Sequence, residues 1–237
     1  SPPASLALER LWMKIEGWNV DHDNLGQPGS MAAIGQEWAS VSAAPFHLFK
    51  FNASEGGLRV PMLITGPGIT GQGFVNARSH VTDLAPTLLD AAHVPFDPAE
   101  FNGRSLMPVL SAEALEVYEE SDAVAFEVTG AAALYKGQWK ITKTPEPFGD
   151  GAWHLFDIEL DPSETTDVAL DHPEVFRELI DDYQAYAAKV GVFELAPGQS
   201  ARKQLTVNGI KKFSVNYWYL VASLMGVSLT ALYLVFF

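Results

Sequence analysis

The last 24 residues of the chain, 214–237, carry no charged side chain, and this run constrains the fold more than any other part of the sequence. At 1.5 Å per residue, a helix of that length spans about 36 Å, which is enough to cross a bilayer core. Tyr217, Trp218 and Tyr219 stand near the start of the run, as is typical of the membrane interface, and Gly226 either allows close helix packing or is an ordinary small residue of the span. We therefore predict one transmembrane helix over 214–237. A helix buried in a protein core is the alternative.

Basic residues flank this predicted span on one side only. They precede it and are Arg202, Lys203, Lys211 and Lys212. The positive-inside rule then places the preceding domain on the cytoplasmic side. A periplasmic domain is the alternative, because an upstream signal would override the rule. We interpret 193–213 as a linker, since it mixes Pro, Gly, Ser and basic residues without clear periodicity. The protein is thus predicted to be a single-pass membrane protein with a C-terminal anchor.

Composition and charge exclude several classes of function. The net charge of −14 repels nucleic acid, so we expect no DNA or RNA partner. The absence of cysteine excludes disulfides, thiolate metal sites and cysteine nucleophiles. The histidines do not show metal-ligand spacing, as the positions of His47, His80, His93 and His154 illustrate. We predict no metal site and no cofactor on this chain.

The sequence predicts two parts in the body of the chain, 1–110 and 111–192. In the first, the apolar run 59–65 predicts a buried strand, and 83–92 predicts a helix with Thr82 or Asp83 as its cap. The second begins with four strand-like runs that predict an antiparallel meander: 123–128, 131–135, 138–143 and 153–158. A helix follows, from Asp171 as N-cap to about Val190. Its predicted buried stripe is Val175, Phe176, Leu179, Tyr183, Tyr186 and Val190.

Lys50 is the most informative residue for function. It precedes the Gly56–Gly57 pair, which is followed by the predicted strand 59–65. Glycines permit backbone angles that other residues avoid, and a lysine held on such a turn is a good ligand for an oxyanion. The structural alternative is an ordinary solvated lysine.

The motif around Lys50 resembles a signature of the type I sulfatases, in which a lysine precedes Glu-Gly-Gly-x-Arg-Val-Pro. Four further segments resemble the same family in the same order. They are the Asp-Leu-Ala-Pro-Thr-Leu-Leu-Asp helix at 83–90, the Gly-Arg-Ser-Leu turn at 103–106, and the Gly-Gln-Trp-Lys and Asp-Pro-Ser-Glu motifs at 137–140 and 161–164. The resemblance covers about residues 15–192 and is to bacterial arylsulfatases.

This resemblance implies the C-terminal portion of an alkaline-phosphatase-like α/β fold, with a small four-stranded antiparallel sheet and a long helix. It also implies hydrolysis of sulfate esters by a formylglycine beside a calcium ion. Lys50 is the one anion-binding residue that carries over. No Cys/Ser-x-Pro-x-Arg motif occurs in the sequence, and Asp23–Asn24 is interpreted as a loop rather than a metal pair. No catalytic set is complete, so the isolated chain is predicted to be inactive.

Two hypotheses of different classes follow. In the first, the chain is a non-catalytic accessory subunit of an integral membrane protein complex, docked by its C-terminal helix. In the second, it is the C-terminal half of a membrane-bound arylsulfatase, completed by an N-terminal half. The second hypothesis predicts a broad apolar face on residues 1–110. A soluble carbohydrate-binding module is a third interpretation, but no exposed aromatic platform is evident.

Overall fold

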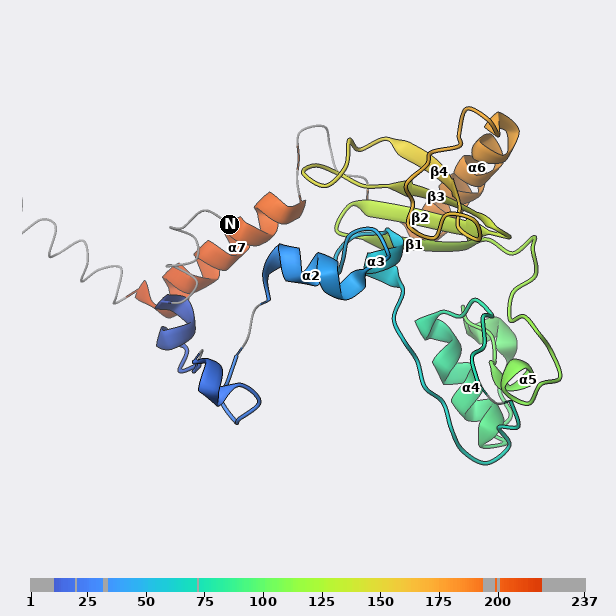
Figure 1. The fold of residues 1–237 in the computed structure, drawn as a ribbon, viewed down its shortest axis with the longest axis horizontal. Coiled ribbons are helices and arrows are strands. Elements are labelled where there is room, and N and C mark those ends of the chain that lie inside the picture. Colours follow the sequence, from blue (N-terminus) through green and yellow to red (C-terminus); the bar gives the residue numbers. More distant parts are fainter. Residues whose placement is uncertain are drawn as a thin grey trace, which may run out of the picture.

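The computed structural model describes residues 11–19, 21–31, 34–71, 73–193, 199 and 201–218 (Figure 1). A four-stranded sheet with one long helix against it forms the best packed part of the chain. The elements in chain order are η1 (His22–Asn24), α2 (Gly35–Ala43), α3 (Glu55–Leu58), η2 (Val81–Asp83), α4 (Leu84–Ala91), η3 (Pro98–Glu100), α5 (Met107–Leu110), β1 (Val124–Val128), β2 (Ala131–Lys136), β3 (Trp139–Lys143), β4 (Trp153–Asp157), α6 (Pro173–Val190) and α7 (Ala201–Asn216).

The sheet is an antiparallel meander in the order β1-β2-β3-β4, as predicted. Strands β2 and β3 are joined by a tight link in which Gly137 has φ 53°, a left-handed value that glycine adopts readily. The register pairs Lys140 with Phe156 and Thr142 with His154. Because neighbouring residues of a strand point to opposite faces, these four side chains lie on one face of the sheet.

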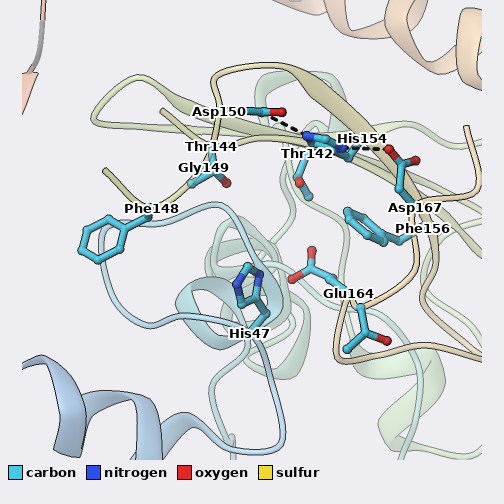
Figure 2. Close-up of a pocket in the computed structure, with 11 residues that line it drawn as sticks. His47, Thr142, Thr144, Phe148, Gly149, Asp150, His154, Phe156, Glu164 and Asp167 are labelled. Atoms are coloured by element: carbon cyan, nitrogen blue, oxygen red, sulfur yellow. Dashed lines mark hydrogen bonds and ion pairs between the residues drawn. The ribbon is translucent and has the colours of Figure 1, made fainter. Parts of the chain in front are cut away.

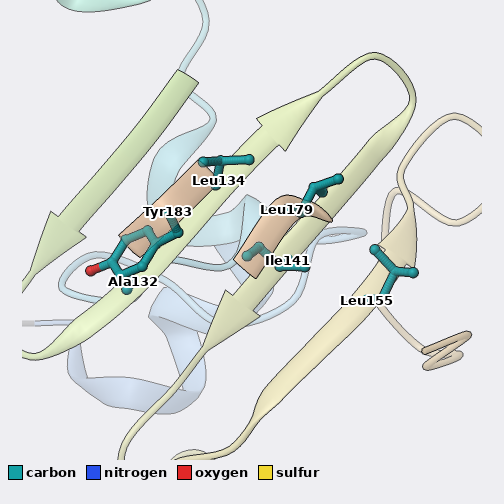
Figure 3. Packing of buried hydrophobic residues seen from close by; sticks show 6 residues of the cluster. All are labelled: Ala132, Leu134, Ile141, Leu155, Leu179 and Tyr183. Atoms are coloured by element: carbon teal, nitrogen blue, oxygen red, sulfur yellow. The ribbon is translucent and has the colours of Figure 1, made fainter. Parts of the chain in front are cut away.

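The opposite face of the sheet packs against α6. Leu134, Ile141 and Leu155 are completely buried there, together with Leu179 of the helix (Figure 3). Burial of each such side chain contributes roughly 1.5–3 kcal/mol. The predicted helix and most of its stripe are confirmed, but its N-cap residue is His172 and not Asp171, because the helix begins at Pro173. Val190 was predicted wrongly, because it lies 53% exposed at the last turn, where Gly191 ends the helix in a left-handed conformation.

The predicted helix over 83–92 is present as α4, and its N-cap residue is Asp83, as predicted, although the Asp83 side chain makes no cap hydrogen bond to α4. The turn η2 just before α4 has a capping box of its own. The His80 ring accepts a hydrogen bond from the Thr82 amide at 3.2 Å, and the Asp83 carboxylate accepts one from the His80 amide at 2.6 Å. Asp83 is fully buried and also accepts from the Arg104 amide at 2.9 Å. The cap therefore ties α4 to the turn at Gly103–Leu106.

The buried strand predicted over 59–65 does not form in the described part of the chain. These residues are extended but unpaired, and Leu63 is 92% exposed. A strand of a parallel sheet is stable only between neighbouring strands that pair with it. The described residues offer no such neighbour, so the apolar sequence stays on the surface. Further apolar side chains are exposed nearby, at Val60, Met62, Phe74 and Val75.

The segment predicted as a linker is helical from Ala201 as α7, because Arg, Lys, Gln and Leu are good helix formers. The basic flank, Arg202, Lys203, Lys211 and Lys212, lies on this helix. Among the described residues, no helix combines the length and apolar character needed to cross a bilayer. Of the predicted span, Tyr217 and Trp218 are described, whereas Tyr219, Gly226 and the rest of 219–237 lie outside the described residues.

Candidate functional site

Lys50 lies on an exposed loop that leads directly into α3. Its ammonium sits 4.9 Å from the centre of the Phe51 ring, and no ion pair with another described residue occupies it. Leu48 and Phe51 on either side have φ values of 58° and 74°. Such left-handed backbone costs about 1–2 kcal/mol per residue outside glycine and is often found at functional sites. The loop thus holds a free cation in a defined, strained conformation.

Gly56 and Gly57 are required for a different reason than the sequence suggested. Neither has a positive φ, because both lie within the short helix α3. Instead, a Cβ on Gly56 would lie 2.2 Å from the carbonyl oxygen of Leu48, and one on Gly57 would lie 2.2 Å from that of Asn52. The glycines therefore let the Lys50 loop pack directly on the backbone of α3.

A buried ion-pair cluster fastens α3 to the sheet. The ammonium of Lys140 lies 2.8 Å from a carboxylate oxygen of Glu55 and 2.8 Å from one of Glu164. The Glu55 amide donates to the other Glu164 oxygen at 2.7 Å. All three side chains are at most 4% exposed. We call Glu55, Lys140 and Glu164 the clasp.

Two neighbours complete the clasp. The Tyr135 hydroxyl donates to Glu55, and Arg59 lies 3.7 Å from the other oxygen of the same carboxylate. Burial alone would raise the pKa of Glu55, but the charge and hydrogen bond of Lys140 outweigh burial and hold that pKa below its usual value. Burial and the Glu55 charge raise the pKa of Tyr135 well above its usual value, so the phenol remains a donor.

The clasp was missed by the sequence analysis. Glu55 is bonded to Lys140 and Glu164, which are 85 and 109 residues further along the chain. Both partners belong to motifs that had been quoted for the family resemblance, but neither had been given a role. A signal was present, because Lys140 stands between the apolar residues Trp139 and Ile141 in a predicted strand. The clasp positions the Lys50 loop by holding α3, on which that loop rests.

A cleft of about 370 Å³ opens beside the clasp, on the same face of the sheet (Figure 2). Strands β3 and β4 supply its floor, the β3–β4 loop supplies one wall, and the Lys50 loop contributes His47. Its polar and aromatic lining includes His47, Thr142, Thr144, Phe148, Asp150, His154, Phe156, Glu164, Thr165 and Asp167.

His154 links the two sides of this cleft. One ring nitrogen lies 2.7 Å from Asp167 and the other lies 3.0 Å from Asp150, as the dashed lines in Figure 2 show. Burial lowers the pKa of His154, but hydrogen bonds to the two carboxylates more than compensate, so its pKa is raised above 6.5.

We therefore expect the contribution of His154 to the stability of the fold to depend on pH. Because the pKa of His154 is higher in the folded state, its stabilising contribution is complete below pH 6.5 and is lost as pH rises through the folded-state pKa. NMR titration of the His154 ring should give a pKa above 6.5, and Asp150→Asn should lower it. A wild-type pKa at or below 6.5 would contradict the bridged geometry.

The residues described do not fit a metal centre. No group of three or more His, Asp or Glu side chains converges among them in a way that could hold an ion. Asp23 and Asn24 lie in the exposed turn η1, as the loop interpretation expected. The sequence also contains no cysteine and no Cys/Ser-x-Pro-x-Arg motif.

Residues 48–185, more than half of the chain, match the family model described as N-sulphoglucosamine sulphohydrolase, C-terminal. The chain belongs to this sulfatase family. The matched region contains Lys50, the clasp and nearly all of the cleft lining. The sheet and long helix described above are therefore a sulfatase C-terminal domain.

Named relatives agree with this assignment. An uncharacterized sulfatase of Schizosaccharomyces pombe is 30% identical over 178 residues, covering 72% of this chain and 32% of the relative. Arylsulfatase K of Mus musculus is 34% identical over 140 residues, covering 54% of this chain and 24% of the relative. An arylsulfatase of Klebsiella aerogenes is 40% identical over 75 residues, covering 31% of this chain and 16% of the relative. The sulfatase domain described here thus spans less than a third of each relative.

Solved structures show the same fold. Ps i-CgsB in complex with k-i-k-neocarrahexaose matches with a TM-score of 0.55 at 23% identity, covering 70% of this chain and 36% of that one. A structure from work on glycosaminoglycan metabolism by Bacteroides thetaiotaomicron matches with a TM-score of 0.52 at 24% identity, covering 60% of this chain and 32% of that one. The sulfatase-like α/β fold, with its four-stranded sheet and long helix, is confirmed.

Proposed function

We propose that this chain supplies the C-terminal part of a sulfate-ester hydrolase, in which Lys50 binds an oxygen of the sulfate group. The observation that carries the proposal is the free ammonium of Lys50 on a strained loop that is fastened by a buried clasp. A cation held in place before the reaction stabilises developing negative charge without reorganisation. Membership of the sulfatase family and the names of the relatives support the same chemistry.

The charges around Lys50 suit an anionic substrate in spite of the net charge of −14. Glu55 and Glu164 are the acidic groups fastened behind the loop, and both are buried and paired with Lys140. Paired charges project little field into solvent, so they do not cancel the attraction of Lys50 for sulfate. The clasp thus holds the cation in position without placing unpaired negative charge behind it.

The nucleophile and the cation of such an enzyme would come from residues outside the described chain. Relatives are more than three times as long as the segment that matches them. The exposed apolar residues of the extended segments, Val60, Met62, Leu63, Phe74 and Val75, support the expectation that another part of a sulfatase covers this surface.

The accessory role in a membrane complex, the C-terminal anchor and the cytoplasmic placement stay predictions. The residues on which the anchor depends lie mostly outside the described part of the chain. The intact Lys50 loop favours the sulfatase proposal, because a purely structural subunit has no use for a free cation on strained backbone.

The test is isolation of the protein from its native source, with intact mass, N-terminal sequencing and identification of everything that co-purifies. We expect a longer product or a companion polypeptide that carries Cys/Ser-x-Pro-x-Arg, together with hydrolysis of an aryl sulfate. If the chain comes away only with unrelated integral membrane proteins and the preparation hydrolyses no sulfate ester, the accessory role replaces the proposal.

A further inference from the structure

Helix α7 has a charge opposite to that of the rest of the chain. Residues 201–218 include four of the 15 Lys and Arg residues and none of the 29 Asp and Glu residues, although the net charge of the chain is −14. The four basic residues are Arg202, Lys203, Lys211 and Lys212, and Glu194 is the last acidic residue of the sequence. A basic segment attached to an acidic chain indicates an acidic partner for that segment.

Helix α7 stands outside the packed part of the described structure. None of its residues belongs to either buried apolar cluster of the described chain, and Figure 1 shows the helix apart from the sheet and α6. Lys211 and Lys212 are exposed and form no ion pair with a described residue. Their positive charges are therefore not neutralised by the fold.

One side of α7 combines this charge with exposed apolar and aromatic side chains. Val207, Lys211, Val215 and Trp218 are spaced by four, four and three residues, so they lie on the same side of the helix. Val215 is 74% exposed and Trp218 is 67% exposed. The partner of this side must therefore accept both an apolar surface and lysine ammonium groups.

An anionic lipid bilayer meets both requirements. Tryptophan favours the boundary between headgroups and acyl chains, and lysine reaches from an apolar surface to the charged layer above it. At 1.5 Å per residue, Lys211 and Lys212 lie about 9–11 Å from Trp218 along the helix, within reach of the same headgroup layer. The acidic body of this chain, or of a second copy, would pair with the lysines but would give Val215 and Trp218 no apolar surroundings.

We propose that α7 binds the surface of an anionic lipid bilayer, with Lys211 and Lys212 at the headgroups and Val215 and Trp218 in the apolar boundary below them. Negative surface potential attracts a basic helix and falls off within a Debye length of about 8–10 Å. The acidic residues of the sheet domain, held further from the surface, are screened from it over that distance. Such binding requires neither Lys50 nor a bilayer-crossing segment.

Hydrogen exchange of the full chain, followed by mass spectrometry, tests this placement. The chain is mixed with vesicles of phosphatidylcholine alone or with about one-third phosphatidylserine. Exchange over 201–218 should be at least about fivefold slower with phosphatidylserine, the factor expected for one lysine at a negative surface. Raising the ionic strength from about 0.1 M to about 1 M should remove the difference, because the Debye length falls to about 3 Å. Exchange in β2 and β3 should not respond to the lipid.

A double variant, Lys211→Gln with Lys212→Gln, removes both charges and retains a similar helix propensity. We expect it to lose the slowing caused by phosphatidylserine. The matched control is Arg177→Gln with Lys189→Gln, which removes two positive charges from exposed positions of α6. The control should respond to phosphatidylserine like the wild type.

Three results would overturn the proposal. Equal slowing by both kinds of vesicle would mean that α7 responds to apolar contact alone. Salt-sensitive slowing that is already complete without vesicles would mean that α7 pairs with the acidic body of this chain or of a second copy. An unchanged response in the Lys211/Lys212 double variant would exclude these lysines as the lipid contacts. Hydrolysis of a sulfate ester enters none of these measurements, so the proposed function is tested separately.

Discussion

Replacement of Lys140 by methionine is expected to lower the free energy of unfolding by about 3–5 kcal/mol, because it leaves the Glu55 and Glu164 carboxylates buried without their shared cation. Methionine fills a similar volume, so the loss reports on charge rather than on a cavity. Urea denaturation at pH 7 measures it. Hydrogen exchange should also become faster over residues 47–55, since the clasp holds this loop through α3.

The matched control is Lys136→Met on the neighbouring strand. Lys136 also contacts two carboxylates, Glu178 at 2.7 Å and Asp182 at 2.8 Å, but it remains 20% exposed and its partners more so. Solvent screens these ion pairs, so we expect Lys136→Met to lower the free energy of unfolding by less than about 1 kcal/mol. Equal losses in the two variants would contradict the role given to the clasp.

The cost of Lys140→Met should depend on pH. In the wild type, the pKa of Glu55 is held below its usual 4.5, so its contribution to stability is present above that value and is lost as pH falls. Without Lys140, burial dominates and favours the neutral acid. The difference between variant and wild type should therefore shrink between pH 7 and pH 5. A difference that grows on acidification would mean that Glu55 is not the group left unpaired.

The elements that sequence reasoning predicted correctly are those determined by local pattern. Alternation along β1 to β4 and the Lys136–Gly137 link predicted the meander, and helical periodicity predicted α6. The strand at 59–65 was wrong, because an apolar run becomes a strand only where partners exist. Helix α4 and its N-cap residue Asp83 were predicted correctly, but the capping box of the turn η2 before it depends on a histidine, which is not among the usual N-cap residues.

The same contrast, between features set by local sequence and features set by distant partners, applies to the candidate site. Lys50 could be found because its motif is contiguous in the sequence. For the clasp, the sequence offered a signal only at Lys140. Its pairing with Glu55 and Glu164 could not be found, because these residues are far apart in the chain and meet in the interior, where lysine and glutamate are rarely buried. The reason for Gly56 and Gly57 also required the structure, since the close approach of the Leu48 and Asn52 carbonyls is invisible in sequence. The cleft depends on the β3–β4 register and a loop closure of the same kind.

Lys50 carries the central claim, and its replacement has the largest expected effect on activity. Lys50→Ala should lower kcat/KM for an aryl sulfate by roughly 10²–10³, the usual cost of removing one preorganised group that stabilises charge. The fold should be unaffected, because Lys50 is exposed and forms no ion pair with a described residue. Lys50→Arg keeps the charge and should retain more activity than Lys50→Ala, although its planar head cannot copy the ammonium. Lys189→Ala, an exposed change on α6, controls for loss of surface charge.

The most direct measurement is therefore aryl sulfate hydrolysis by the native preparation, complete with any companion polypeptide, in wild-type, Lys50→Ala and Lys189→Ala forms of equal melting temperature. The account predicts that only Lys50→Ala loses activity, by two orders of magnitude or more. Hydrolysis by Lys50→Ala at the wild-type rate would show that this lysine does not hold the sulfate, and the proposed function of the chain would fall with it.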